Sequence, residues 1–315
     1  MTYDLVTLGE VLLRLAMPSP ARFETVRQLD VQIGGAEANV AAACARLGLA
    51  TAWLSALPAN EWGERVRREL TGHGVDCRHV RVLEGSRMGV YFLEYGAAPR
   101  PIRVLYDRRD SAFARLTVDD VDWEPVRRAR LVHLSGVTPA LGEGPRSLVR
   151  RAAREASTLS FDVNYRATLW SPAEARAFVA EVLPAVRYLF VGKAEARQVF
   201  GLEGAPEDVL DRLAHEAPRA TIALMQGDEG ATVLDSGRLV RARRRHVVHV
   251  VDPVGAGDAY VAGVLWSLLR GRTIEDAVEA GGVVAALKCS TWGDIALVSV
   301  RDVEEALESG PDIRR

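Results

Sequence analysis

The residues best placed to do chemistry lie in a small-residue segment that precedes a helical run. Asp258 directly follows three small residues, Gly255, Ala256 and Gly257. Small residues let the backbone approach a ligand closely, and the free N–H groups of a helix N-terminus form an anion site. A carboxylate beside such a site suits phosphoryl transfer to a hydroxyl group, because it takes the proton while the amides hold the negative charge. The alternative is that Asp258 only caps the helix.

A second pair of glycines precedes another helical run. Gly34 and Gly35 come directly before an alanine-rich segment, and Asn39 lies in its first turns. The Asn39 amide could bond a polar ligand that lies over the glycines. Close packing of a small-residue helix explains the same pattern. Taken alone, this segment leaves both interpretations open.

The pattern of strands and helices that must position these residues indicates an α/β fold. Short apolar runs alternate with segments of helical period, which is typical of a parallel sheet covered by helices on both faces. We expect strands at 3–8, 51–57, 131–134, 159–162, 188–191, 220–224 and 231–234, and helices at 37–47, 61–73, 146–155, 172–183, 206–215, 258–269, 274–286 and 300–308.

Two stretches interrupt this rhythm. The segments at about 12–33 and 86–112 lack helical period and alternate apolar with polar residues, which indicates extra strands. We expect these strands to form a small lid beside the main sheet. The whole chain, 1–315, then forms a single domain with this lid attached.

Composition excludes several classes of protein. The 315 residues are 48% hydrophobic and 26% charged, which is typical of a globular chain. A net charge of −2 provides no basic field for nucleic acid or an anionic membrane, so neither is expected as a partner. Three widely spaced cysteines argue against a disulfide framework. With no cleavable signal pattern at the start and no apolar run long enough for a bilayer, we expect a cytoplasmic protein.

The two glycine segments together resemble a known family. GGAEANVA at 34–41 and DPVGAGD at 252–258 are similar to the paired signatures of the ribokinase-like (PfkB) carbohydrate kinases, in the same order. The resemblance implies a three-layer α/β/α fold whose mainly parallel central sheet carries a β-stranded lid. It also implies Asp258 as catalytic base, residues 255–257 as anion hole, and ATP with Mg²⁺. A requirement for a monovalent cation stays open.

The middle of the chain resembles one group within that family, the 2-keto-3-deoxygluconate kinases. The matching segments are FDVNYRATLWS at 161–171, SGVTP at 135–139 and RVLYDR at 103–108. This implies a sugar-acid substrate phosphorylated on its 6-hydroxyl. Arg108 and Arg166 could each grip the carboxylate, and Tyr91 and Tyr106 could contact the sugar. A solvated surface position is the alternative for either arginine.

The resemblance also implies contacts on the nucleotide side. Asn164 and Arg166 would face the nucleotide, and a loop with Gly227 and Gly230 would lie over it, together with Gly255 and Gly257 of the anion hole. The family usually has a basic residue before this loop, where this chain has MQ at 225–226.

Two further positions carry expectations from the family. Glu195 would help to place the magnesium–phosphate complex indirectly, although the usual asparagine three residues before it is Gly192 here. Asp294 would contact the sugar end, with a simple loop turn as the alternative.

The leading hypothesis is therefore an ATP-dependent 2-keto-3-deoxygluconate kinase. The alternatives are another PfkB sugar kinase, such as a fructokinase or a ribokinase-like enzyme, and a catalytically silent sugar-binding regulator on the same fold. We expect a sugar acid and ATP as small-molecule partners. We also expect a homo-oligomer, a dimer or larger, assembled through the lid.

Overall fold

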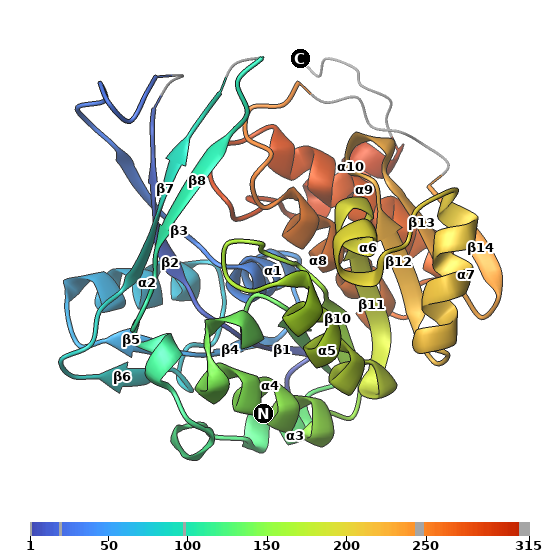
Figure 1. Ribbon diagram of the computed structural model, residues 1–315, viewed down its shortest axis with the longest axis horizontal. Helices are drawn as coiled ribbons and strands as arrows, with labels where there is room; N and C mark the ends of the chain where they lie inside the picture. Colours follow the sequence, from blue (N-terminus) through green and yellow to red (C-terminus); the bar gives the residue numbers. More distant parts are fainter. Residues whose placement is uncertain (1, 19–20, 97–98, 243–248, 309–315) are drawn as a thin grey trace.

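An eight-stranded sheet forms the centre of the computed structural model, which describes residues 2–18, 21–96, 99–242 and 249–308 (Figure 1). Its strand order is β14-β13-β12-β11-β10-β9-β1-β4. The six strands from β12 to β4 are parallel, and β13 and β14 add an antiparallel edge. The strand bounds are β1 Leu5–Leu8, β4 Thr51–Leu54, β9 Leu131–Ser135, β10 Leu159–Asp162, β11 Val186–Gly192, β12 Thr221–Met225, β13 Ala231–Asp235 and β14 Arg238–Arg241.

Helices cover both faces of this sheet, so the parallel strands are buried on both sides as their apolar runs predict. One face packs against α4 (Glu143–Glu155), α5 (Pro172–Val182), α6 (Lys193–Phe200) and α7 (Pro206–Glu216). The other face packs against α1 (Ala36–Arg46), α8 (Ala256–Leu269), α9 (Ile274–Cys289) and α10 (Val300–Glu308). The chain also forms α2 (Glu61–Gly72) and the short α3 (Glu124–Arg128). This is the expected three-layer α/β/α arrangement.

The two stretches without helical period build a separate four-stranded sheet with the order β3-β2-β7-β8. Its strands are β2 (Leu12–Ala16), β3 (Asp30–Gly34), β7 (Gly89–Glu94) and β8 (Arg103–Asp107). Figure 1 shows them standing away from the helical layers. One face packs tyrosines and aliphatic side chains toward Val254, just ahead of α8. We refer to this sheet as the lid.

The parallel strands of the main sheet bring several loops to one edge. The chain leaves β1 at Gly9, β9 at Ser135, β10 at Asp162 and β11 at Gly192, and these are the carboxyl ends of neighbouring strands. Ligand sites in such sheets form outside the carboxyl ends. The lid begins at the same edge, because β2 follows β1 after three residues.

The predicted elements agree with the structure in kind, with a few differences. The run predicted at 51–57 divides into β4 and β5 (Ala56–Pro58), which pairs with β6 (Arg81–Leu83) outside the main sheet. The sequence pattern does not predict β6, β14, α3 or α6. In the part of the chain that the structure describes, no helix has the length and apolar character to cross a membrane.

Candidate active site

The small-residue loop ahead of α8 has the geometry of an anion site. Gly255 is the N-cap of α8 and adopts a left-handed backbone with φ of 84°. A Cβ on Gly255 would lie 2.2 Å from the carbonyl oxygen of Asp294, so only glycine fits there. None of the described residues accepts a hydrogen bond from the amides of Gly255, Gly257 or Asp258. These first-turn donors are free to bind an anion at the helix N-terminus.

Asp258 lies beside these amides and is held in place by two asparagines. Its Oδ2 accepts a hydrogen bond of 2.7 Å from Asn39 Nδ2, and its Oδ1 lies 3.5 Å from Asn164 Nδ2. Burial raises the pKa of Asp258 to about 7, while Asn39 and Arg166 oppose that shift. A carboxylate with a pKa near neutrality is well matched to accept a proton from a hydroxyl group.

The paired glycines ahead of α1 make room for the lid. A Cβ on Gly34 would lie 2.3 Å from Asp294 Oδ2, and one on Gly35 would lie 2.2 Å from the carbonyl oxygen of Glu10. Tyr91 on β7 donates a hydrogen bond of 2.7 Å to Asp294 Oδ2. The two predicted contacts of the sugar end, Tyr91 and Asp294, therefore bind each other directly beside the glycines.

Arg108 lies just after β8 and is buried against the base of the lid. It binds Glu10 Oε2 through Nε at 2.8 Å and Nη2 at 2.5 Å. Its guanidinium also lies 5.5 Å from the ring centre of Tyr106, and Tyr106 packs beside Tyr91 with ring centres 6.0 Å apart. The structure thus joins the three predicted lid residues into one cluster and adds Glu10 as the partner of the arginine.

The loop after β10 presents the other predicted arginine. Asn164 has a positive φ of 40°, and its backbone amide donates to Asp162 Oδ1 at 3.2 Å. Arg166 lies within electrostatic range of Tyr106 and Asp258, and within the described ranges no carboxylate is close enough to form an ion pair with it. Its Nη1 donates a hydrogen bond of 3.2 Å to the Tyr165 carbonyl, and the guanidinium lies at the site without an ion pair to any described carboxylate.

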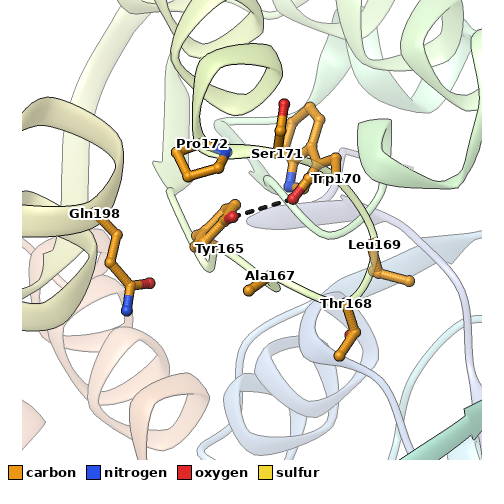
Figure 2. Close-up of a pocket in the computed structure, with 8 residues that line it drawn as sticks. All are labelled: Tyr165, Ala167, Thr168, Leu169, Trp170, Ser171, Pro172 and Gln198. Carbon is orange, nitrogen blue, oxygen red and sulfur yellow. Dashed lines mark hydrogen bonds between the residues drawn. The ribbon is translucent and has the colours of Figure 1, made fainter.

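A side-chain bond closes this loop on its far side. Figure 2 shows Tyr165 pointing to Trp170, and the Tyr165 hydroxyl donates a hydrogen bond of 3.0 Å to the Trp170 carbonyl. The two residues line a shallow cavity of about 570 Å³ together with Gln198 of α6. This bond fixes the turn that holds Asn164 and Arg166 in place.

Three carboxylates gather at the carboxyl end of β10. Burial, followed by the charges of Glu195 and Asp258, raises the pKa of Asp162 well above its usual value. Glu195 itself accepts backbone hydrogen bonds, from Gly192 at 2.8 Å and from Tyr165 at 3.0 Å. In the described part of the chain, no three acidic, histidine or cysteine side chains lie close enough to hold a metal ion directly. The acidic cluster suits a hydrated cation that is held mainly by other ligands.

Three of the predicted nucleotide-side residues, Gly227, Gly230 and Gly257, border a second and larger cavity of about 850 Å³. Asn164, Arg166 and Gly255 are not among the residues that line it. Gly227 and Gly230 lie on its wall and have positive φ angles. Ala256 and Gly257, at the start of α8, also line it. The apolar part of the lining includes Tyr260, Val278, Ala285 and Ala286. An apolar slot that includes a helix N-terminus fits a flat base with an attached chain of phosphates.

Several residues of the site carry little signal in the sequence. Arg14 on β2 is completely buried and pairs with both Asp252 and Asp294. Lys288 on α9 is also completely buried, and its Nζ donates to the Asp252 carbonyl at 2.7 Å. The sequence signals for them are a charged residue inside the apolar run LLRLA and the rarity of lysine, which occurs twice in the chain.

Comparisons with known proteins agree with this geometry. The model of the pfkB family carbohydrate kinases matches residues 3–300. The chain is 38% identical to the 2-dehydro-3-deoxygalactonokinase of Haloferax volcanii, over 98% of each chain. It is 33% identical to the 2-dehydro-3-deoxygluconokinase of Thermoproteus tenax, over 97% of this chain and 94% of that protein.

A solved structure shows the same arrangement. The crystal structure of 2-dehydro-3-deoxygluconokinase from Thermotoga maritima superposes with a TM-score of 0.91 at 31% identity, covering 97% of this chain and 99% of that one. The match extends over the main sheet and the lid alike, because so little of either chain is left out. The chain belongs to the pfkB family of carbohydrate kinases and is a sugar kinase, a phosphotransferase with an alcohol group as acceptor.

Proposed function

We propose that this kinase phosphorylates a 2-keto-3-deoxy sugar acid on its terminal 6-hydroxyl, with ATP as the phosphate donor. The observation that carries the proposal is the position of Asp258, a carboxylate of raised pKa beside free helix amides and close to a lid that presents arginine and tyrosine. The named activities of the relatives at 38% and 33% identity support the choice of substrate class.

The chemistry assigned to the protein is proton removal and charge stabilisation. Asp258 takes the proton of the 6-hydroxyl while the oxygen of that hydroxyl forms a bond to the γ-phosphorus. The bond from that phosphorus to the β–γ bridging oxygen breaks, and ADP leaves with the electron pair. The free amides of Gly255 and Gly257 hold the charge on the transferring group, whereas the Ala256 amide already donates to the Pro253 carbonyl at 3.2 Å. Arg166, which has no ion-pair partner in the described ranges, neutralises the phosphates or the substrate carboxylate.

Recognition of the acid group is assigned to Arg108. Glu10 uses only Nε and Nη2 of this guanidinium, and Nη1 has no partner among the described residues. An arginine can bind a second carboxylate through the nitrogen that remains. Glu10 then holds the guanidinium in one orientation while Nη1 binds the substrate.

The acidic cluster fits Mg²⁺ bound to the nucleotide. Asp162 and Glu195 would hold the ion through its waters, because the Glu195 oxygens already accept backbone amides. Mg²⁺ supplies neutralisation of the phosphate charge when it is bound. Burial and repulsion from Glu195 together raise the pKa of Asp162, and a nearby cation would relieve that repulsion.

A cytoplasmic location and assembly through the lid remain predictions.

The test is ADP release with Mg²⁺-ATP across a panel of acceptors. The panel contains 2-keto-3-deoxygluconate, its galactonate epimer, gluconate, fructose, ribose and adenosine. Selective turnover of the keto-deoxy acids is expected. Turnover of fructose or ribose instead would be consistent with Asp258 as the base but would contradict the role of Arg108 in binding the substrate carboxylate. Sugar binding without ATP binding, measured by calorimetry, would favour a silent regulator.

A further inference from the structure

Asp252 is the anchor of the loop that carries the anion site, and every polar group of this residue is bound. Its backbone amide donates to the Cys289 carbonyl at 3.2 Å. Its Oδ1 accepts the Val254 amide at 3.0 Å, and its Oδ2 accepts the Gly293 amide, also at 3.0 Å, and the Tyr95 hydroxyl at 2.7 Å. These bonds hold the start of the loop in one position.

Two buried cations meet at this anchor. Arg14 reaches it from lid strand β2 and pairs with the Asp252 and Asp294 carboxylates. Lys288 reaches it from the last turn of α9, with Nζ 2.7 Å from the Asp252 carbonyl oxygen and 4.0 Å from its Oδ1. The side chains of Arg14, Lys288 and Asp252 are all completely buried. Burying charges is costly unless they are paired, so the two cations and two carboxylates stabilise one another.

The position of Lys288 has a direct consequence for the anion site. Its ammonium and the Cys289 carbonyl hold the C=O and N–H groups of Asp252 from the same end of α9. The backbone at the start of the loop therefore cannot rotate without breaking a buried charged hydrogen bond. Gly255 carries the first amide of the anion site and lies three positions after Asp252. The direction in which these N–H groups point therefore depends on the fixed backbone position of Asp252.

We propose that Lys288 is a positioning residue for the anion site and a cation built into the chain, so that phosphoryl transfer needs no monovalent metal ion from solution. A carbonyl oxygen next to a carboxylate is the donor set that a monovalent cation would take, and here the ammonium of Lys288 occupies it. The inference rests on the proposed function, because it assumes that the free amides of Gly255 and Gly257 bind the transferring phosphate.

The experiment measures turnover of the keto-deoxy acid with Mg²⁺-ATP in potassium, sodium, ammonium and tetramethylammonium chloride at constant ionic strength. The wild-type rate is expected to be the same in all four salts. Lys288→Met keeps an unbranched side chain that is one heavy atom shorter and removes the charge, and kcat should fall roughly 10²-fold with little change in the KM of the sugar acid. Ammonium or potassium should restore part of that rate, and tetramethylammonium, which is too large, should not.

Lys193→Met is the matched control, because Lys193 is the other lysine and its side chain is 62% exposed. Its rate should not respond to the choice of cation. Thermal unfolding in the same salts gives a readout that does not depend on the substrate: potassium should raise the Tm of Lys288→Met and leave that of the wild type unchanged.

Two results would overturn the proposal. One is a wild-type enzyme that requires potassium, which stays decisive even if Lys288→Met does not fold. The other is a folded Lys288→Met enzyme with wild-type kcat in every salt. Failure of the wild type to turn over any keto-deoxy acid would count against the proposed substrate instead, and the Tm comparison would then decide the role of Lys288.

Discussion

Asp258 combines two properties that a base for hydroxyl activation needs. Burial holds its pKa at about 7, and Asn39 fixes its orientation through a 2.7 Å hydrogen bond. A carboxylate at its ordinary pKa would be a weaker base, and one without a fixed orientation would meet the hydroxyl less often. The free amides at the start of α8 lie beside the same side chain.

Replacing Asp258 with asparagine should abolish most of the turnover. The amide has nearly the same shape and cannot accept the proton, so kcat should fall by about 10²–10⁴-fold while sugar binding is retained. Steady-state kinetics and calorimetry on Asp258→Asn give the two quantities. Turnover close to that of the wild type would show that another group removes the proton.

The pH dependence should report the same carboxylate. Protonated Asp258 cannot act as base, so kcat/KM should decline as the pH falls below about 7 and level off above it. The hydrogen bond from Asn39 lowers the pKa of Asp258, and Asn39→Ala should therefore move this limb to higher pH. A limb that stays in place in Asn39→Ala would argue that a different group controls it.

Arg108 should separate acidic from neutral sugars. Arg108→Ala removes the guanidinium and should raise the KM of a keto-deoxy acid much more than that of fructose. Glu10→Gln leaves the guanidinium but weakens its hold, and a smaller effect in the same direction is expected. Kinetics with both sugars test this, and an equal loss for both would count against recognition of a carboxylate.

At the scale of an element, the turn into α8 depends on glycine for two separate reasons. Gly255 has a φ of 84° and leaves no room for a Cβ beside Asp294, whereas Gly271 has a φ of 74° with open space around it. A left-handed backbone costs an alanine about 1–2 kcal/mol at either position. Only an alanine at 255 would also force the loop ahead of α8 to shift.

The pair of variants separates these effects. Gly255→Ala should lose roughly 10²-fold in kcat because the anion-site amides move, whereas Gly271→Ala should lose stability alone. Thermal unfolding and kcat on both variants provide the comparison. Equal kcat in the two would mean that the loop tolerates the displacement.

The main elements could be predicted because their signals are local. Both glycine segments, the strands of the parallel sheet and the lid stretches follow from period and residue type over short windows. β14 has arginine at both ends and α6 has eight residues, so neither carries a strong pattern. The prediction of one strand at 51–57 missed the break between β4 and β5.

The buried part of the site could not be predicted in the same way. Arg14 and Asp252 are 238 positions apart, and an isolated arginine in an apolar run gives no sign of its partner. Glu10 and Arg108 are likewise joined only by the fold, 98 positions apart. The pairing of buried charges depends on the packing of lid and core, which period and composition do not describe.

At the scale of the whole molecule, buried charges join the lid to the catalytic loop. Arg14 and Tyr95 of the lid bind Asp252, and Tyr91 binds Asp294. The lid is thus bonded to two acidic residues that both lie next to the loop at Gly255. A lid held in this way can exclude water, which would otherwise compete with the sugar as acceptor.

Loss of Arg14 should therefore weaken the whole protein. Arg14→Met leaves two carboxylates buried without their main partner, and the free energy of unfolding should fall by about 3–5 kcal/mol. Arg301→Met is the control, since its ion pair with Glu305 is exposed and should matter little. Denaturant unfolding of both variants tests this, and equal stability would show that the buried pairs are not coupled to folding.

The proposed reaction is tested most directly by identifying the product with ³¹P NMR after incubation with Mg²⁺-ATP and 2-keto-3-deoxygluconate or its galactonate epimer. We predict a phosphate monoester on the terminal hydroxyl from the wild type, and almost none from Asp258→Asn although that variant still binds the sugar. Phosphorylation at another hydroxyl, or an active Asp258→Asn enzyme, would contradict the proposed reaction.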